Sequence, residues 1–176
     1  MKAFGQAGRQ RAKDEERREE LVQMVAFAVG DGEYALDIMR IKEIINPLPV
    51  TAVPKAPDFI EGVIELRGAI LPVVDVRKRF DLAPSAPTRA TKFVIVGLDV
   101  GATAAGRMIV GLVVDRVSEP LRIPKSEVRP APQLTVGERA FFSGVVHHGE
   151  RMLMVLDVDA LLSTGEKQTL SGMARV

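Results

Sequence analysis

Residues suited to catalysis or metal binding are few in this sequence. The chain has two histidines, His147 and His148, and no cysteine. Neighbouring residues on a strand point to opposite faces of a sheet, so these two imidazoles are poorly placed to hold one metal ion. No serine lies in a Gly-x-Ser-x-Gly elbow, and GATAAGR (101–107) lacks the Lys-Ser/Thr pair of a phosphate loop. The sequence therefore predicts no enzyme, no metal site and no cofactor.

Two aspartates, Asp75 and Asp157, each follow an apolar, β-branched segment. An aspartate at the end of a strand can accept hydrogen bonds from the backbone N–H groups of the following turn. Both residues occupy the same place in a segment that occurs twice in the chain. A carboxylate repeated in this way fits a role in the fold better than a role in one active site, so we predict that both are structural.

The repeated segment is GVIELRGAILPVVDV (62–76), which aligns without a gap with GVVHHGERMLMVLDV (144–158). Six of the fifteen positions are identical, and both copies begin with a glycine, Gly62 and Gly144. Short strands separated by frequent turn signals favour small closed sheets. We therefore predict a mainly β fold with one motif used twice, as two five-stranded barrels with short helices. The alternative is a single sandwich whose strands resemble one another by chance.

Apolar periodicity and the prolines predict the other elements. We expect a strand in 22–30, a strand followed by a short helical turn in 34–45, and an extended loop or edge strand in the four-proline segment 46–58. The first copy of the repeated segment forms two strands that meet at Gly68. A short helix follows Asp157.

Composition along the chain predicts a tail at each end of one domain. Residues 1–21 are highly charged and form a tail or a solvated helix. Residues 22–163 form the domain, with subdomains of about 22–88 and 89–163 on either side of a proline-rich linker. Residues 164–176 are expected to be a polar, poorly ordered tail.

The overall composition narrows the classes of partner. Apolar residues make up 47% of the chain and the net charge is +1, which favours a globular protein and gives no strong attraction to nucleic acid or membrane. No apolar run reaches the roughly 18 residues of a membrane span, and no signal peptide is recognisable. We therefore expect a cytoplasmic protein. An oligonucleotide-binding small barrel is the rival class, but most aromatic side chains fall in apolar runs, not on a stacking platform.

Arg67 interrupts the apolar repeat and has two interpretations. On a strand through residues 63–67, Glu65 and Arg67 share one face and Ile64 faces the core. Gly68 lets another backbone approach closely. Arg67 is then either a strut paired with Glu43 or Glu65, or an anchor for a partner protein, since arginine is enriched at binding hot spots. The residues alone leave both open.

Several motifs together resemble CheW, the adaptor of bacterial chemotaxis arrays. They are FAVGDGEYALDI (27–38), IKEI (41–44), FIEGVIELRGAILPVVDVRKRF (59–80), VVDRVSE (113–119) and VRPAP (128–132). The resemblance extends from about residue 22 to 162. It implies two SH3-like barrel subdomains around a shared core and no catalysis. It also implies a protein that ties a CheA-type histidine kinase, through its regulatory domain, to the cytoplasmic tips of chemoreceptors, with other CheW-like domains as further candidate partners.

By the family pattern, the residues that bind the receptor or support that surface are Ile41, Glu43, Gly62 and Arg67, with an ion pair between Glu43 and Arg67. Glu65 stands where the family commonly has asparagine, and the charged N-terminal segment lies outside the pattern. A specialised, non-flagellar chemosensory system is therefore an alternative setting. A CheA-type regulatory domain, which has the same pair of barrels, is the rival within the family.

Overall fold

The computed structural model describes residues 20–100, 107–131 and 141–173. The predictions for the N-terminal segment 1–19 and for most of the loop 101–107 lie outside these residues. Among the described residues, no helix has the length and apolar character needed to cross a membrane.

Eleven strands make up most of the described chain. The elements are β1 Leu21–Val29, β2 Gly32–Asp37, η1 Ile38–Arg40, β3 Ile41–Ile45, β4 Ile60–Leu66, β5 Ala69–Asp75, α2 Val76–Arg79, β6 Lys92–Asp99, β7 Arg107–Val114, β8 Arg116–Pro124, η2 Lys125–Glu127, β9 Arg129–Pro130, β10 Phe142–His148, β11 Arg151–Leu156, η3 Val158–Ala160 and α3 Thr164–Met173.

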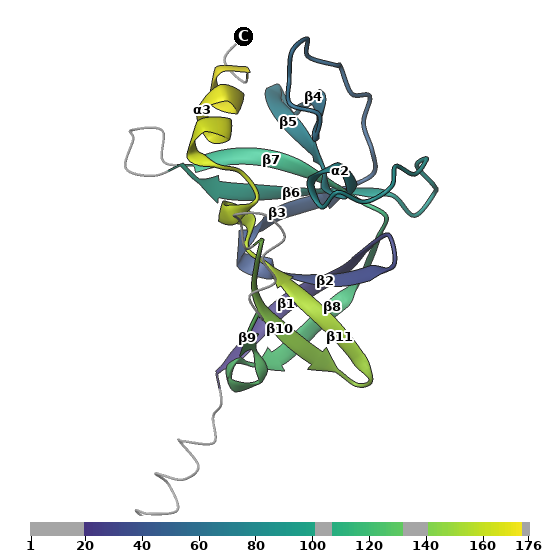
Figure 1. The fold of residues 1–176 in the computed structure, drawn as a ribbon, viewed down its shortest axis with the longest axis vertical. Coiled ribbons are helices and arrows are strands. Elements are labelled where there is room, and N and C mark those ends of the chain that lie inside the picture. Colours follow the sequence, from purple (N-terminus) through teal and green to yellow (C-terminus); the bar gives the residue numbers. More distant parts are fainter. Residues whose placement is uncertain (1–19, 101–106, 132–140, 174–176) are drawn as a thin grey trace, which may run out of the picture.

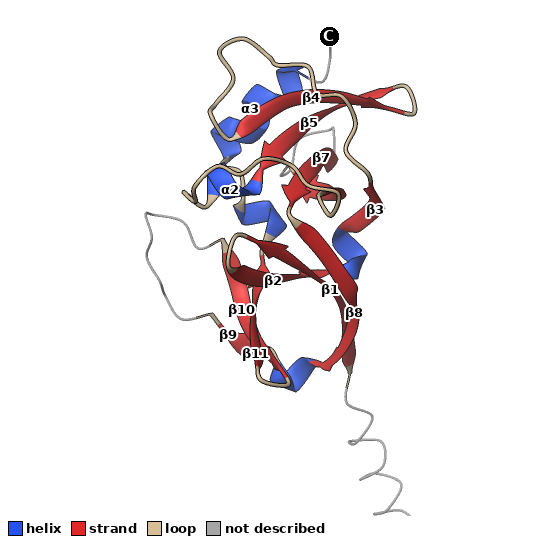
Figure 2. Cartoon of the chain, turned by 90° about the vertical axis from the view of Figure 1, so that its right-hand side faces the viewer, coloured by secondary structure: helices blue, strands red, loops and turns tan. Residues whose placement is uncertain are grey.

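These strands form two sheets, one above the other in Figure 1. Sheet A has the order β8-β1-β2-β11-β10-β9, and sheet B has the order β3-β6-β7-β5-β4. The strands of sheet A curve around a common axis, as Figure 2 shows. Sheet A has a sixth strand only because the two-residue β9 pairs with β10. A mainly β fold with two sheets and a few short helices is therefore confirmed.

The two copies of the motif exchange strands between the sheets. The first copy comprises β1 to β5, and the second comprises β6, β7, β8, β10 and β11. Sheet B joins β3, β4 and β5 of the first copy to β6 and β7 of the second. Sheet A joins β1 and β2 of the first copy to β8, β10 and β11 of the second. The parallel pairs Val73–Gly111 and Val155–Ala35 stand at equivalent places in the two sheets. The predicted division near residue 88 therefore does not coincide with the division between the sheets.

The exchange occurs at two short connections. Three residues, η1, separate β2 from β3, and a single residue, Asp115, separates β7 from β8. At both places the chain leaves one sheet and enters the other. Hydrophobic periodicity reports which residues face a core, but not which sheet a strand joins, and so the sequence did not predict the exchange.

The largest apolar cluster lies where the two sheets meet. It draws buried side chains from both sheets, such as Leu36 and Leu156 from sheet A and Val74 and Leu98 from sheet B. Smaller clusters fill the interior of each sheet. Met24, Leu121, Val146 and Leu153 belong to the one in sheet A, and Ile64, Leu71, Phe93 and Ile95 belong to the one in sheet B.

The C-terminal segment differs from the expectation of a poorly ordered tail. Residues 164–173 form helix α3, which lies beside sheet B in Figure 1, and Leu170 on this helix is fully buried. The carboxylate of Glu166 accepts hydrogen bonds of 3.0 and 2.9 Å from the guanidinium of Arg79. Ser163 and Glu166 cap the helix reciprocally. The composition of the segment is polar, and its order comes from contacts distant in sequence.

Asp75 and Asp157 make the hydrogen bonds expected of structural residues. Oδ1 of Asp75 accepts from the N–H of Arg77 at 2.9 Å and starts α2. Oδ1 of Asp157 accepts from the N–H of Asp159 at 3.1 Å and starts η3.

Candidate docking surface

The turn between β4 and β5 places Arg67 at the tip of the hairpin. Strand β4 ends at Leu66, so Arg67 lies one residue beyond the strand and does not share a strand face with Glu65. Arg67 has φ +50° and Gly68 has φ +80°, the pattern of a type I′ turn. Left-handed backbone is unusual for a residue with a branched or bulky side chain, and it often marks a functional position.

Glu43 on β3 is the partner of Arg67. Its carboxylate accepts a hydrogen bond from Nη1 of Arg67, and the two form an ion pair. The Arg67 side chain nevertheless remains 75% exposed, whereas that of Glu43 is 25% exposed. One face of the guanidinium is therefore held by the protein and the rest faces outward. The ion pair implied by the family resemblance is present.

Ile41 lies on the same strand as Glu43. Its side chain is half-buried and packs against the large apolar cluster between the sheets. Lys42 and Ile44, which alternate with it along β3, are exposed. Since β3 is an edge strand of sheet B, these residues lie along a rim next to the Glu43–Arg67 pair.

Gly62 lies apart from the ion pair. It lies five positions before Arg67 along the chain, which is about 16 Å at roughly 3.3 Å per residue. Here the backbone of Thr51 crosses β4 and exchanges two hydrogen bonds of 2.9 Å with Val63. A Cβ on Gly62 would stand 2.1 Å from the carbonyl oxygen of Thr51. The position therefore admits only glycine for steric reasons, and Gly62 supports the hairpin without reaching its surface.

A groove runs over the outer face of the same hairpin. Its volume is about 510 Å³, and its lining includes Leu48, Val63, Glu65 and Ile70. Glu65 pairs directly with Ile70 across the hairpin. Sequence reasoning did not single out Ile70. The signal was present, because an isoleucine opposite an exposed glutamate on a two-strand hairpin must face the same side.

Two further ion pairs join the two copies of the motif. Arg40, at the end of η1, contacts Asp159 at 2.6 Å. Arg77 on α2 pairs with Asp115, the residue between β7 and β8. In both pairs the arginine belongs to the first copy of the motif and the aspartate to the second.

Both aspartates have perturbed acidities. Partial burial favours the protonated form of Asp159, but the hydrogen bonds from Arg40 and from the N–H of Asp99 outweigh burial and lower its pKa. Asp115 is similar, because the hydrogen bonds from Arg77 and from the N–H of Gly30 outweigh burial and lower its pKa. These carboxylates are ionised at neutral pH and are structural.

Within the described ranges, no cluster of histidine, cysteine and acidic side chains is suited to hold a metal ion. His147 and His148 are both exposed at the end of β10. The strand ends there, and the sheet offers no cover to either side chain.

Comparison with known proteins agrees with this arrangement. The family described as the CheW-like domain matches residues 23–166. A probable chemotaxis protein CheW from Rhizobium etli is 35% identical over 147 residues, which are 83% of this chain and 90% of that protein. A chemotaxis protein CheW from Klebsiella aerogenes is 34% identical over 154 residues, which are 87% of this chain and 89% of that protein.

A solved structure is also similar. The crystal structure of the scaffolding protein TtCheW from Thermoanaerobacter tengcongensis matches with a TM-score of 0.72 and 30% sequence identity. The match covers 82% of this chain and 89% of that one. The similarity in sequence and in structure extends over most of the chain, and the chain belongs to the CheW-like domain family.

Proposed function

We propose that the protein is a non-enzymatic adaptor that couples chemoreceptors to a CheA-type histidine kinase in a chemosensory array. The observation that carries the proposal is the outward-facing Arg67, held by Glu43 at the tip of a hairpin in a CheW-like domain. The protein acts by holding partners in position. It works in the cytoplasm and reaches the membrane through the receptors that it binds.

The receptor contact is assigned to the rim formed by β3 and the β4–β5 turn. Arg67 presents the part of its guanidinium that Glu43 leaves free, and this part can form paired hydrogen bonds with a carboxylate or with carbonyl groups of a helical receptor tip. Ile41 and Glu43 support this contact from β3, and Gly62 supports the hairpin. The strut and the anchor interpretations of Arg67 then describe two sides of one side chain.

The kinase contact is assigned to the edges of the sheets. Sheet B ends at β3 and β4, and sheet A ends at β8 and β9. The free backbone groups of an edge strand can pair with a strand of a homologous barrel, and a regulatory domain of the kinase or another CheW-like domain would offer one. Each contact is weak by itself, and the array gains strength by making many of them at once.

The test is reconstitution of the full chain with receptor-bearing membranes and a histidine kinase. Arg67→Ala is expected to weaken association with receptors about tenfold or more and to remove receptor control of the kinase. Arg107→Ala is the matched control, because it removes an equally exposed arginine that is 3.9 Å from Asp99. A normal response from Arg67→Ala would contradict the assignment of the receptor contact.

Exchanging the two charges separates the two roles of Arg67, the ion pair with Glu43 and the contact with the receptor. The double variant Glu43→Arg, Arg67→Glu restores an ion pair with the opposite polarity. We expect it to recover the thermal stability lost in either single variant but not the receptor response. Recovery of both would mean that Arg67 acts only as a strut. Failure of the kinase to co-sediment with any variant, or with the unchanged protein, would contradict the adaptor proposal itself.

A further inference from the structure

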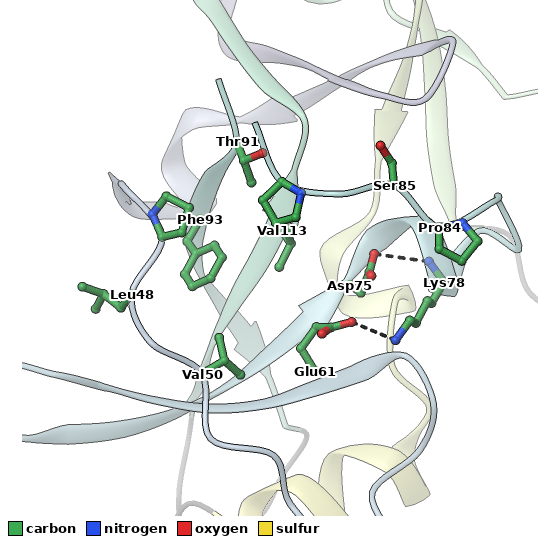
Figure 3. Close-up of a pocket in the computed structure, with 12 residues that line it drawn as sticks. Leu48, Val50, Glu61, Asp75, Lys78, Pro84, Ser85, Thr91, Phe93 and Val113 are labelled. Carbon is green, nitrogen blue, oxygen red and sulfur yellow. Dashed lines mark hydrogen bonds and ion pairs between the residues drawn. The ribbon is translucent and has the colours of Figure 1, made fainter. Parts of the chain in front are cut away.

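A second concave site lies at the opposite end of the β4–β5 hairpin from Arg67. Its volume is about 360 Å³, within the range of roughly 300–1,000 Å³ that is typical of ligand pockets. It opens at the mouth of sheet B, between the loop that follows β3 and the loop that follows α2 (Figure 3). Glu61 in this pocket lies five positions before Leu66 along β4, about 16 Å of strand from the turn. The pocket shares Leu48 with the groove on the outer face of the hairpin, but Arg67 and Glu43 do not line it.

One side of the pocket is apolar. Leu48 and Val50 come from the loop after β3, and Phe93 and Val113 come from β6 and β7. Figure 3 shows the Phe93 ring and these aliphatic side chains around one end of the pocket. They continue the apolar cluster in the interior of sheet B, to which Phe93, Leu48 and Val113 belong. An apolar side chain that entered here would extend an existing core. It would move from water to an apolar surface that is already formed.

The other side of the pocket is charged, and its charges do not balance. Nζ of Lys78 forms an ion pair of 2.9 Å with Glu61, and the carboxylate of Asp75 lies beside them (Figure 3). Two carboxylates thus face one ammonium group, which leaves one negative charge in excess. The nearby Arg77 does not neutralise it, because its guanidinium pairs with Asp115. Asp58 is also close enough to act on Lys78 electrostatically.

The two carboxylates influence each other. Partial burial raises the pKa of Asp75, and the neighbouring Glu61 raises it further, against the hydrogen bonds from the backbone of Lys78 and Arg77. The hydrogen bond from Lys78 lowers the pKa of Glu61. A cation placed next to the pair would relieve the repulsion between them.

We propose that this pocket docks an extended peptide segment in which an apolar side chain stands next to a lysine or arginine. The apolar side chain occupies the end lined by Leu48 and Phe93, and the basic side chain neutralises the excess charge of Glu61 and Asp75. This gives the adaptor a third contact, which does not include Arg67 and is made by the side chains that line the pocket, not by the backbone groups of an edge strand. The segment belongs to a partner protein.

The experiment is a titration of the isotope-labelled full chain with capped peptides, followed by two-dimensional NMR. The probe is acetyl-Ala-Leu-Arg-Ala-amide, and the reporters are the backbone amides of Val50, Thr91 and Phe93. Saturable shifts at these amides are expected. The Ala-Leu-Glu-Ala and Ala-Ser-Arg-Ala peptides should bind at least about threefold more weakly. The first lacks the basic side chain and the second lacks the apolar side chain.

Two substitutions in the pocket should act in opposite directions. Lys78→Gln removes the only cation of the pocket and should tighten binding of the arginine peptide about two- to fivefold, whereas Glu61→Gln should weaken it to a similar degree. Both side chains are more than one third exposed, so each variant should fold. Lys125→Gln is the matched control, because it makes the same charge change at an exposed ion pair with Glu20 elsewhere.

Three results would overturn the proposal. The first is no saturable shift at the pocket amides, and the second is equal behaviour of Lys78→Gln and Lys125→Gln. The third is binding of a free amine such as phenethylamine without binding of the peptide, which would make the site one for small molecules. Arg67→Ala should leave the peptide titration unchanged. A failed peptide titration would therefore not contradict the adaptor proposal. A failure of receptor coupling would not contradict the peptide pocket.

Discussion

The β4–β5 and β10–β11 hairpins share one backbone plan and differ at their turns. Each has a register shift at a glycine where another segment crosses, Thr51 over Gly62 and Arg129 over Gly144. Each is closed at its end by an aspartate whose N–H donates over 2.8 Å to a phenylalanine carbonyl at the start of the hairpin. At the turn, the second hairpin places Gly149 at φ +63°, where the first places an arginine.

This difference separates residues that build the motif from the residue that distinguishes one copy. The glycine and aspartate anchors recur because both hairpins need the same crossing and the same cap. Arginine in place of glycine at a left-handed position costs about 1 kcal/mol, and the first hairpin retains that cost. A cost kept in one copy and absent from the other supports a role for Arg67 outside the fold.

The largest expected effect comes from breaking the shared crossing. Gly62→Ala should destabilise the protein by about 3 kcal/mol, and Gly144→Ala by about 1 kcal/mol. The difference arises because a Cβ would stand 2.1 Å from the Thr51 oxygen in the first case and 2.8 Å from the Arg129 oxygen in the second. Urea unfolding measures both. Equal losses would show that the two crossings are equally tolerant.

Exchanging the turn residues should change stability in opposite directions. Gly149→Arg is expected to cost about 1 kcal/mol, because it puts a bulky side chain at φ +63°. Arg67→Gly should leave stability unchanged or raise it slightly, while removing receptor coupling. Thermal unfolding and the reconstituted kinase assay test the pair. A strongly destabilised Arg67→Gly would mean that the ion pair with Glu43 outweighs the backbone strain.

The ion pairs between the two copies predict a dependence on pH. Asp159 has a lowered pKa in the folded protein, so its contribution is complete above the ordinary value of 3.8 and is lost as the pH falls through the folded pKa. Asp159→Asn should cost about 1 kcal/mol at pH 7, a value discounted because a third of each partner is exposed. The difference in free energy of unfolding between this variant and the unchanged protein should vanish in acid. A difference that persists in strong acid would rule out linkage to this carboxylate.

The smallest effect is expected at the cap of the first copy. Asp75 has a raised pKa in the folded protein, so stability declines as the pH rises from its ordinary value of 3.8 through the folded pKa. Asp75→Asn keeps a capping oxygen and removes the repulsion with Glu61. At neutral pH we expect a change of less than about 0.5 kcal/mol, in the stabilising direction. Unfolding at pH 3 and pH 7 would show whether the gain appears only at the higher pH.

Much of the site was predictable because its determinants are local. The alternation of apolar residues, the glycines and the aspartates mark both hairpins, and the dipeptide Arg67-Gly68 marks the turn of the first. The residues alone left Glu43 and Glu65 as candidate partners of Arg67, and the family resemblance favoured Glu43, which is 24 residues away in the sequence. The groove over Ile70 and the pocket at Phe93 could not be anticipated, because each is lined by several segments.

By itself, the sequence determined that the protein is mainly β and that one motif occurs twice in it. Turn chemistry and strand periodicity act over a few residues, and both can be recognised in a single sequence. Only the tertiary structure decided that the copies exchange strands, that α3 packs through Leu170, and that Glu61, Lys78 and Asp75 meet at one pocket. Those outcomes depend on packing between segments far apart in sequence, whose energy no local pattern reports.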